Sequence, residues 1–288
     1  CFLQLFKNGL AYQKESYQWW CPNDQTVLAN EQVENGHCWR CGAEVEKKKM
    51  KQWFFKITDY ADRLLADVDS LDWPEKIKTM QKNWIGKSIG SEVVFQVADS
   101  AHQIKVFTPR IDTIFGATFL VLAPEHSLAL ELATEDQKTE VAEYIKNAIK
   151  KTEIERQENK EKTGVFTGAY AIHPLTGNQI PIYVADYVLI GYGEGAVKAV
   201  PAHDERDQAF AEKYNLEVKT VIDENEILIN SGDYTGLTSE EAKAKITADL
   251  EKDHIAAPRT TYRMRDWLIS RQRYWGCPIP IAYDKDGN

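Results

Sequence analysis

Two carboxylates in the C-terminal half of the chain have the type and spacing to bind a cation. Asp204 and Asp207 follow the apolar run 196–200, which is interrupted only by Lys198 and stopped by Pro201. Asp204 is placed to cap a helix, with Asp207 in its first turn. A carboxylate at a helix N-terminus stays ionised, which suits the binding of a ligand ammonium. The simpler alternative is that both only cap the helix and complement its dipole.

A second polar group of residues is the stretch TPRIDT at 108–113, which lies between two apolar segments. The hydroxyls of Thr108 and Thr113, together with Arg110 and Asp112, indicate more than a connecting loop. Alternatively, Asp112 is the N-cap of a short helix and Arg110 is its partner.

Three cysteines near the N-terminus have the spacing of metal ligands. Cys38 and Cys41 are separated by two residues and followed by a glycine, which is typical of half a zinc knuckle, and Cys21 can supply a third thiolate from a facing hairpin arm. Asp24 or His37 could complete a tetrahedron, or the metal could be absent. In that case the segment is a small hairpin packed on its tryptophans.

Hydrophobic periodicity predicts an α+β fold around these groups. Strands are expected at 92–98, 103–108, 164–171, 179–185, 187–190, 196–200, 217–222 and 226–228. Helices are expected at 53–71, 77–85, 204–214 and 235–250, with a helix-like pattern at 2–10. Residues 138–162 predict a solvated helix that ends in a mobile, charged stretch.

Composition excludes several classes of protein. The 288 residues carry a formal net charge of -9, which argues against a protein that coats nucleic acid and leaves room only for a local RNA contact. No apolar run has the length of a membrane span, so a cytoplasmic protein is the default expectation. The chain has no P-loop, no G-x-G-x-x-G after a strand and no G-x-S-x-G. A first residue other than methionine indicates a fragment.

The chain contains, in this order, WCPNDQTVLANEQV at 20–33, WFFKITDYADRLL at 53–65, TPRIDTIFG at 108–116, GYGEGAVKAVPAHDERD at 191–207 and RDWLISRQRYWGCPIP at 265–280. Together these motifs resemble those of the bacterial-type leucyl-tRNA synthetases, a family of class I aminoacyl-tRNA synthetases. The ATP-binding signatures of the family are absent. The resemblance implies a central fragment with a strand-rich, barrel-like editing domain, a zinc-ribbon-like hairpin and linker helices. The implied segments are 1–17 (catalytic core), 18–50 (zinc module), 51–87 (linker helices), 88–260 (editing domain) and 261–288 (return to the core).

The resemblance also implies a reaction and roles for residues. Water hydrolyses the ester of tRNA(Leu) mischarged with isoleucine, norvaline or a similar amino acid. Asp207 would hold the substrate α-ammonium, Thr113 would crowd the side-chain pocket so that leucine is rejected, and Thr108 would bind the reacting ester or its water. Tyr192 and Arg110 would line the adenosine. Further substrate contacts are assigned to Asp112, Lys198, His203 and Asp204.

Four positions depart from the family pattern. Pro109 and Ile111 stand where threonine and proline are usual, and Glu194 and Lys198 stand where threonine and methionine are common. The alternative function is therefore an editing-deficient module that binds the tRNA acceptor end. Zinc is expected with Cys21, Cys38 and Cys41. ATP and Mg are expected only for the full-length ligase, and the implied state is a cytoplasmic monomer that acts on the 3′ end of tRNA(Leu).

Overall fold

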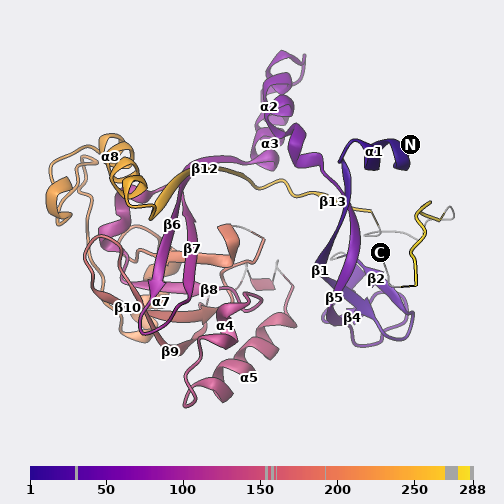
Figure 1. Ribbon diagram of the computed structural model, residues 1–288, viewed down its shortest axis with the longest axis horizontal. Helices are drawn as coiled ribbons and strands as arrows, with labels where there is room; N and C mark the ends of the chain where they lie inside the picture. Colours follow the sequence, from indigo (N-terminus) through magenta and orange to yellow (C-terminus); the bar gives the residue numbers. More distant parts are fainter. Residues whose placement is uncertain are drawn as a thin grey trace. The chain divides into compact units, whose positions relative to one another are not determined.

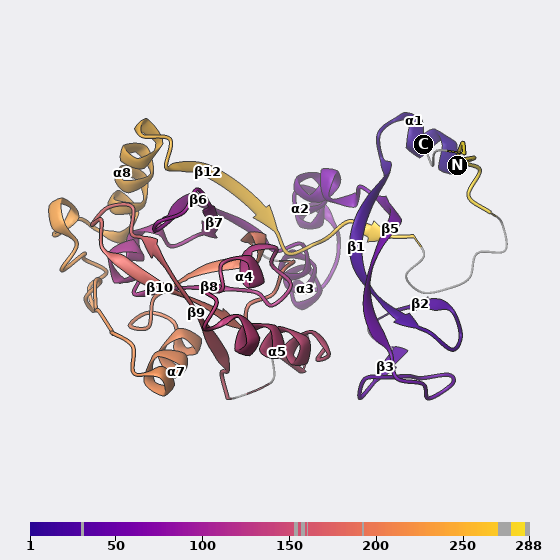
Figure 2. The same ribbon diagram turned by 60° about the horizontal axis from the view of Figure 1, so that its bottom comes forward.

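The computed structural model describes residues 1–29, 32–152, 155–156, 159, 161–191, 193–269 and 278–285. It divides into two compact units, one formed by Cys1–Lys87 with Tyr262–Asn288 and the other by Ser88–Thr261. Figures 1 and 2 show the elements of each unit. Tyr192 and the arginine-rich stretch 270–277 lie outside the described residues. The five-segment division remains a prediction.

A long antiparallel ladder organises the first unit. β1 (Ala11–Cys21) pairs with β5 (Glu46–Phe55), and β2 (Thr26–Leu28) and β13 (Trp267–Leu268) extend the sheet on either side. β3 (Val33–Glu34) and β4 (His37–Cys38) form a separate small hairpin. The remaining elements are α1 (Phe2–Lys7), the 3-10 turn η2 (Ile57–Tyr60), α2 (Ala61–Ser70) and α3 (Glu75–Ile85).

The prediction of a helix at 53–71 is wrong for its first three residues. Residues 53–55 end β5, where Phe54 faces Tyr12 and Phe55 faces Ala11 on β1. A partner strand more than 40 residues away decides their conformation, so their local periodicity was misleading. The second predicted helix is confirmed as α3, and Gly86 ends it in the left-handed conformation that glycine adopts readily.

The second unit is built on a seven-stranded sheet with the order β11-β8-β10-β9-β6-β12, and β7 also pairs with β6. Its strands are β6 (Lys87–Val97), β7 (Gln103–Thr108), β8 (Phe119–Leu122), β9 (Gly164–Ile172), β10 (Gln179–Ala185), β11 (Ala196–Ala199) and β12 (Ala256–Tyr262). β10 and β8 are parallel, and the predicted β6–β7 hairpin is confirmed. These pairings show a mixed α/β unit, whereas closure into a barrel remains a prediction.

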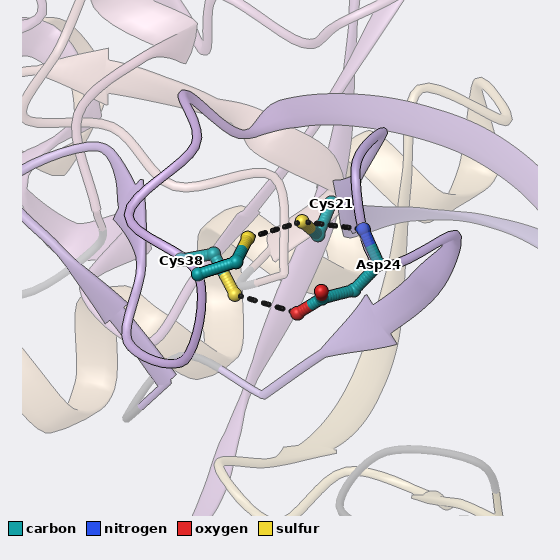
Figure 3. A group of neighbouring side chains, drawn as sticks. Cys21, Asp24 and Cys38 are labelled. Atoms are coloured by element: carbon teal, nitrogen blue, oxygen red, sulfur yellow. Dashed lines mark hydrogen bonds between the residues drawn. The ribbon is translucent and has the colours of Figure 1, made fainter.

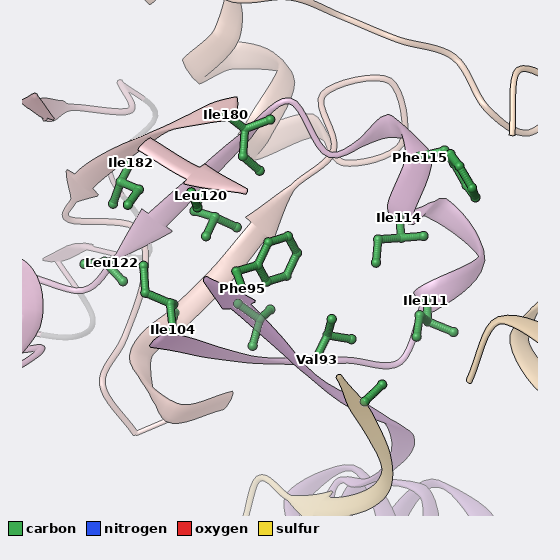
Figure 4. Packing of buried hydrophobic residues seen from close by; sticks show 14 of the residues in the cluster. Val93, Phe95, Ile104, Ile111, Ile114, Phe115, Leu120, Leu122, Ile180 and Ile182 are labelled. Carbon is green, nitrogen blue, oxygen red and sulfur yellow. The ribbon is translucent and has the colours of Figure 1, made fainter. Parts of the chain in front are cut away.

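Both faces of the central strands are buried. On β8, Leu120 and Leu122 enter the larger core, while Phe119 and Val121 enter a second core that contains Phe210. Alternate residues point to opposite faces, so a strand buried on both sides needs a continuous apolar run such as FLVL. Figure 4 shows the larger core, in which residues of β6, β7, β8 and β10 meet those of the 3-10 segment after β7.

Helices and turns cover this sheet. They are η3 (Ile111–Gly116), α4 (Leu128–Glu131), α5 (Lys138–Ile149), η4 (Gly193–Gly195), α7 (Glu205–Tyr214), η5 (Gly232–Tyr234) and α8 (Ser239–Lys252). α5 lies along β9 (Figure 2). α8 contacts η3. Gly90 on β6 lets the backbone of the TPRIDT stretch pass close by, because a Cβ there would lie 2.3 Å from the Thr108 carbonyl oxygen.

Several sequence predictions in this unit are wrong. Residues 187–190 and 217–222 form no strand, and 226–228 contributes only isolated bridges such as that between Ile222 and Leu228. α8 begins at Ser239, after a capping box at Thr238, rather than at residue 235. The helix predicted within 138–162 is confirmed as α5, but solvent exposure is wrong for Arg156, which is only 1% exposed because Glu125 and two carbonyl groups bind its guanidinium. Among the described residues, no helix is both long and apolar enough to cross a membrane.

Candidate functional site

The start of α7 confirms the predicted cap. The Asp204 carboxylate accepts hydrogen bonds from the backbone N–H groups of Arg206, at 2.9 Å, and Asp207, at 3.3 Å. Burial opposes ionisation of Asp204, but the hydrogen bonds and charge of Arg206 outweigh it and lower the pKa of Asp204. Asp204 is therefore a helix cap that stays ionised, as the simpler alternative holds. Its contact with substrate remains a prediction.

Asp207 does more than complement the helix dipole. It is 5% exposed, and its oxygens accept hydrogen bonds from the Tyr187 hydroxyl, at 2.9 Å, and the Val200 N–H, at 2.8 Å. Burial, helped by the nearby charge of Asp204, raises the pKa of Asp207 to about 6. Burial also raises the pKa of Tyr187, which keeps its phenol protonated as a donor. At neutral pH, Asp207 is therefore a buried, oriented carboxylate.

The TPRIDT stretch folds around the backbone of Arg110. The Thr108 hydroxyl oxygen accepts the Arg110 N–H at 3.1 Å, and the Thr113 hydroxyl donates to the Arg110 carbonyl oxygen at 2.8 Å. The fully buried Asp112 binds the Arg110 guanidinium, at 2.9 Å in the closest contact, and the Ser239 hydroxyl at 2.5 Å. Asp112 is therefore the partner of Arg110, as the alternative proposed, but it is not an N-cap. Its hydrogen bond with Ser239 connects η3 to the start of α8.

Lys198 links the two groups of residues. Its Nζ donates to the Thr113 hydroxyl oxygen at 2.7 Å, and the side chain is almost completely buried. Burial lowers the pKa of Lys198 to about 8, although the negative charges of Asp112 and Asp207 oppose that shift. Since Lys198 lies within electrostatic range of both carboxylates, it connects the TPRIDT stretch to the start of α7.

His203 also belongs to this neighbourhood. Its Nε2 accepts the Val221 N–H at 3.2 Å. Partial desolvation, together with the positive charges of Arg110 and Lys198, lowers the pKa of His203, so it is neutral at pH 7. The structure thus brings eight predicted residues together, which we call the polar cluster. They are Thr108, Arg110, Asp112, Thr113, Lys198, His203, Asp204 and Asp207.

Two residues of the hydrogen-bond network, Tyr187 and Ser239, were not predicted from the sequence as site residues. Tyr187 was placed in a strand, yet its hydroxyl orients Asp207, and Ser239 was taken as an interior residue of a helix, yet it binds Asp112. The only available signal was general: a buried tyrosine usually finds a hydrogen-bond partner. Nothing in the local sequence identifies that partner.

A second constellation lies at the hairpin end of the first unit. Cys21, Asp24, Cys38 and Cys41 offer ligand atoms that all lie within 4.8 Å of one another. The Cys21 and Cys41 sulfurs are 3.4 Å apart. The Cys38 sulfur lies 3.4 Å from an Asp24 carboxylate oxygen (Figure 3). His37 instead directs its Nδ1 to the Asn35 carbonyl at 2.9 Å. Asp24 is therefore the fourth candidate ligand.

The donor set suits a tetrahedral ion. Zinc binds thiolates at about 2.3 Å, which places tetrahedral ligand sulfurs about 3.8 Å apart. The Cys21–Cys41 sulfur distance of 3.4 Å is close to this value, and all four ligand atoms lie within 4.8 Å of one another. Three thiolates and one carboxylate could thus hold a metal ion after a small outward adjustment.

Comparisons with known proteins define the class. Residues 235–288 match the family described as tRNA synthetases class I (I, L, M and V), and residues 25–106 match tRNA synthetases class I (M). The fold and these matches together show a class I aminoacyl-tRNA synthetase chain. Residues 82–251, more than half of the chain, match the family described as leucyl-tRNA synthetase, editing domain. The chain therefore belongs to the leucyl-tRNA synthetase family, as its motifs predicted.

Individual relatives give the same result. The chain is 55% identical to the leucine–tRNA ligase of Clostridium beijerinckii and 56% identical to that of Clostridium perfringens, over 99% and 98% of its length. It covers 36% of each of these relatives. A crystal structure of an Agrobacterium radiobacter K84 LeuRS with tRNA and LeuAMS has a TM-score of 0.79 and 42% identity, over 99% of this chain and 34% of that one.

Proposed function

We propose that the unit Ser88–Thr261 hydrolyses the ester of tRNA(Leu) that carries isoleucine, norvaline or a similar noncognate amino acid. The observation that carries the proposal is the polar cluster, in which the buried carboxylate of Asp207 acts electrostatically on Lys198, whose amine donates to the Thr113 hydroxyl. Its location within a leucyl-tRNA synthetase editing domain supports the same reaction. Within a longer protein, the chain would serve ATP- and Mg-dependent leucine–tRNA ligation as a cytoplasmic monomer.

In this proposal Asp207 binds the substrate α-ammonium. Tyr187 and Val200 each donate one hydrogen bond to its oxygens, and a carboxylate has capacity for about four. The remaining lone pairs can accept hydrogen bonds from an ammonium without loss of the existing contacts. Because the same two donors orient the carboxylate, the substrate amine would bind a group that is already in position.

Thr108 would act at the ester. Its oxygen accepts the Arg110 N–H, which leaves the hydroxyl hydrogen to be donated to the ester or to the attacking water. Arg110 would face the adenosine and its phosphate with the part of its guanidinium that Asp112 does not occupy, since its side chain is 52% exposed. The reaction would depend on positioning of water rather than on a strong base.

A direct experiment is to incubate the chain with isoleucyl-tRNA(Leu) and, separately, with leucyl-tRNA(Leu), and to follow the loss of each ester. We expect isoleucine to be released well above the background rate and leucine to be spared. If the chain binds tRNA but both esters decay at the background rate, the alternative of an editing-deficient acceptor-end module is correct.

Replacement of Thr113 tests the rejection of leucine. In Thr113→Ala we expect leucyl-tRNA(Leu) hydrolysis to rise by roughly 10- to 100-fold, because a difference of one methyl or methylene group is worth about 1–3 kcal/mol of discrimination. Thr113→Val is the matched control, since it keeps the volume and loses only the hydroxyl, and it should fall between the wild type and the alanine variant. Continued sparing of leucine by Thr113→Ala would remove Thr113 from this role.

We also propose that Cys21, Asp24, Cys38 and Cys41 bind one zinc ion. Purified protein should then contain about one zinc per chain, and Asp24→Ala should lose it to a chelator more readily than the wild type. Asp24→Cys should retain it, and His37→Ala, the matched control, should leave it unchanged. Zinc that is lost in His37→Ala but kept in Asp24→Ala would show that the fourth ligand is wrong.

A further inference from the structure

Lys198 is a buried amine to which the proposed reaction assigns no chemical step. Its side chain is 8% exposed on β11, whose other residues enter the two apolar cores or lie at their edges. Burial of an ammonium is costly, and the lowered pKa of Lys198, about 8, records that cost. Because burial of this amine costs free energy and the amine lies next to a candidate site, we expect Lys198 to have a role in that site.

The hydrogen bonds of Thr113 define this role. Its hydroxyl donates to the Arg110 carbonyl at 2.8 Å and accepts from Lys198 Nζ at 2.7 Å. A threonine has one side-chain torsion that places its hydroxyl and methyl groups, and two hydrogen bonds on the hydroxyl select one setting of it. The position of the Thr113 methyl group is thereby fixed as well.

We propose that Lys198 is a positioning residue for substrate specificity, which locks Thr113 in the rotamer that excludes leucine from the editing site. This inference rests on the proposed function. Lys198 donates to Thr113 whether it is charged or neutral, so the lock persists across the physiological pH range.

Other charged and titratable groups surround the amine. Those with an electrostatic effect on Lys198, or affected by it, are Arg110, Asp112, His173, His203, Asp204 and Asp207. The three aspartates favour the charged amine, whereas Arg110 and burial oppose it. Thr113 is the partner to which Nζ donates directly, and so the specificity effect is assigned to that bond.

A double-mutant cycle tests the proposal, because Lys198→Met and Thr113→Val remove the same hydrogen bond from its two ends. The quantity is the kcat/KM for leucyl-tRNA(Leu) divided by that for isoleucyl-tRNA(Leu). We expect each single variant to raise this ratio by about 10-fold, the equivalent of one hydrogen bond, and the double variant to raise it no further. Lys105→Met, which removes the same charge from an exposed position on β7, should leave the ratio unchanged.

Stability provides a second readout that is independent of activity. The pKa of Lys198 is lower in the folded than in the unfolded chain, so the unfolded chain binds more protons between pH 8 and about pH 10.4. Wild-type stability should therefore gain a rising contribution with pH in this window, and Lys198→Met should lack it. Thr113→Val should destabilise the unit, because it removes the hydroxyl that accepts the hydrogen bond of the Lys198 amine. Adding Lys198→Met to this variant should recover the lost stability.

The outcomes separate the two proposals. If the wild type fails to hydrolyse isoleucyl-tRNA(Leu), the proposed function fails. If the wild type hydrolyses it and spares leucine, but Lys198→Met also spares leucine or the double variant is additive at about 100-fold, only the role of Lys198 is overturned. A failure of Lys198→Met to reverse the destabilisation caused by Thr113→Val would also overturn it.

Discussion

Asp207→Asn is expected to reduce hydrolysis of isoleucyl-tRNA(Leu) by about 10- to 150-fold. A hydrogen bond to a charged group is worth about 1.5–3 kcal/mol, and each 1.4 kcal/mol corresponds to a tenfold change. The carboxylate is the nearest match in the polar cluster for a substrate ammonium, because Asp112 is occupied by Arg110 and Ser239 and Asp204 by the helix start and Arg206. Loss of this one charge should therefore affect binding of the mischarged end directly.

The asparagine variant is a suitable test because the fold can accommodate it. Asparagine keeps one oxygen, which can accept the Val200 N–H, and its amide can donate to the Tyr187 hydroxyl, which can turn to accept. Glu205→Gln is the matched control, since it removes an equal charge from an exposed position in the first turn of the same helix. Equal losses in the two variants would show that overall charge, rather than Asp207, matters.

The pH profile offers an independent check on the same residue. Since the pKa of Asp207 is raised to about 6, its charge is present above that value and lost as the pH falls through it. Hydrolysis by the wild type should decline below about pH 6, while the residual hydrolysis by Asp207→Asn should lack this step. A wild-type profile that stays flat from pH 7 to pH 5 would contradict the role of the ionised carboxylate.

Arg156→Met is expected to destabilise the unit Ser88–Thr261 by about 3–5 kcal/mol, the usual effect of breaking a buried ion pair from one side. The Arg156 guanidinium lies 2.7 Å from the Glu125 carboxylate, and the two side chains are 1% and 3% exposed. It also donates to the carbonyl oxygens of Asp186 and Val188, on either side of Tyr187. Because Tyr187 orients Asp207, hydrolysis should weaken as well.

The composition of the chain provides a convenient measurement. All eight tryptophans lie outside residues 88–261, so tryptophan fluorescence reports on the other unit. In urea unfolding of Arg156→Met, part of the circular dichroism signal should be lost at a lower urea concentration, because the Ser88–Thr261 unit unfolds earlier. The unfolding transition measured by tryptophan fluorescence should stay at the same urea concentration. The double variant Glu125→Gln with Arg156→Met, which leaves no unpaired charge, should recover part of the loss. Unchanged stability in the single variant would contradict the structural role of the pair.

The sequence predicted those parts of the fold in which local and global preferences agree. The hairpin of β6 and β7 follows from alternation around a polar turn, and α7 follows from the cap at Asp204, which the structure confirms. Residues 53–55 failed because an antiparallel partner at the other end of a long ladder determines their conformation. Charge composition wrongly predicted that Arg156 is exposed, because its burial depends on an ion pair with Glu125, which lies 31 residues away in the sequence.

The candidate site shows the same division. Motif resemblance proposed Thr113 and Asp207 as site residues, but it did not indicate which residues orient them. The hydrogen bond from Tyr187 to Asp207 joins residues 20 positions apart, and the hydrogen bond from Lys198 to Thr113 joins residues 85 positions apart. Such contacts arise from sheet topology, and no local pattern encodes them.

The most direct test of the central claim is a crystal structure of the chain with an amide-linked analogue of isoleucyl-adenosine, which cannot be hydrolysed. We predict that the α-ammonium of the analogue lies at about 2.7–2.9 Å from an Asp207 oxygen, with the isoleucine side chain against Thr113. An analogue that binds elsewhere, or that contacts only one of these two residues, would contradict the account.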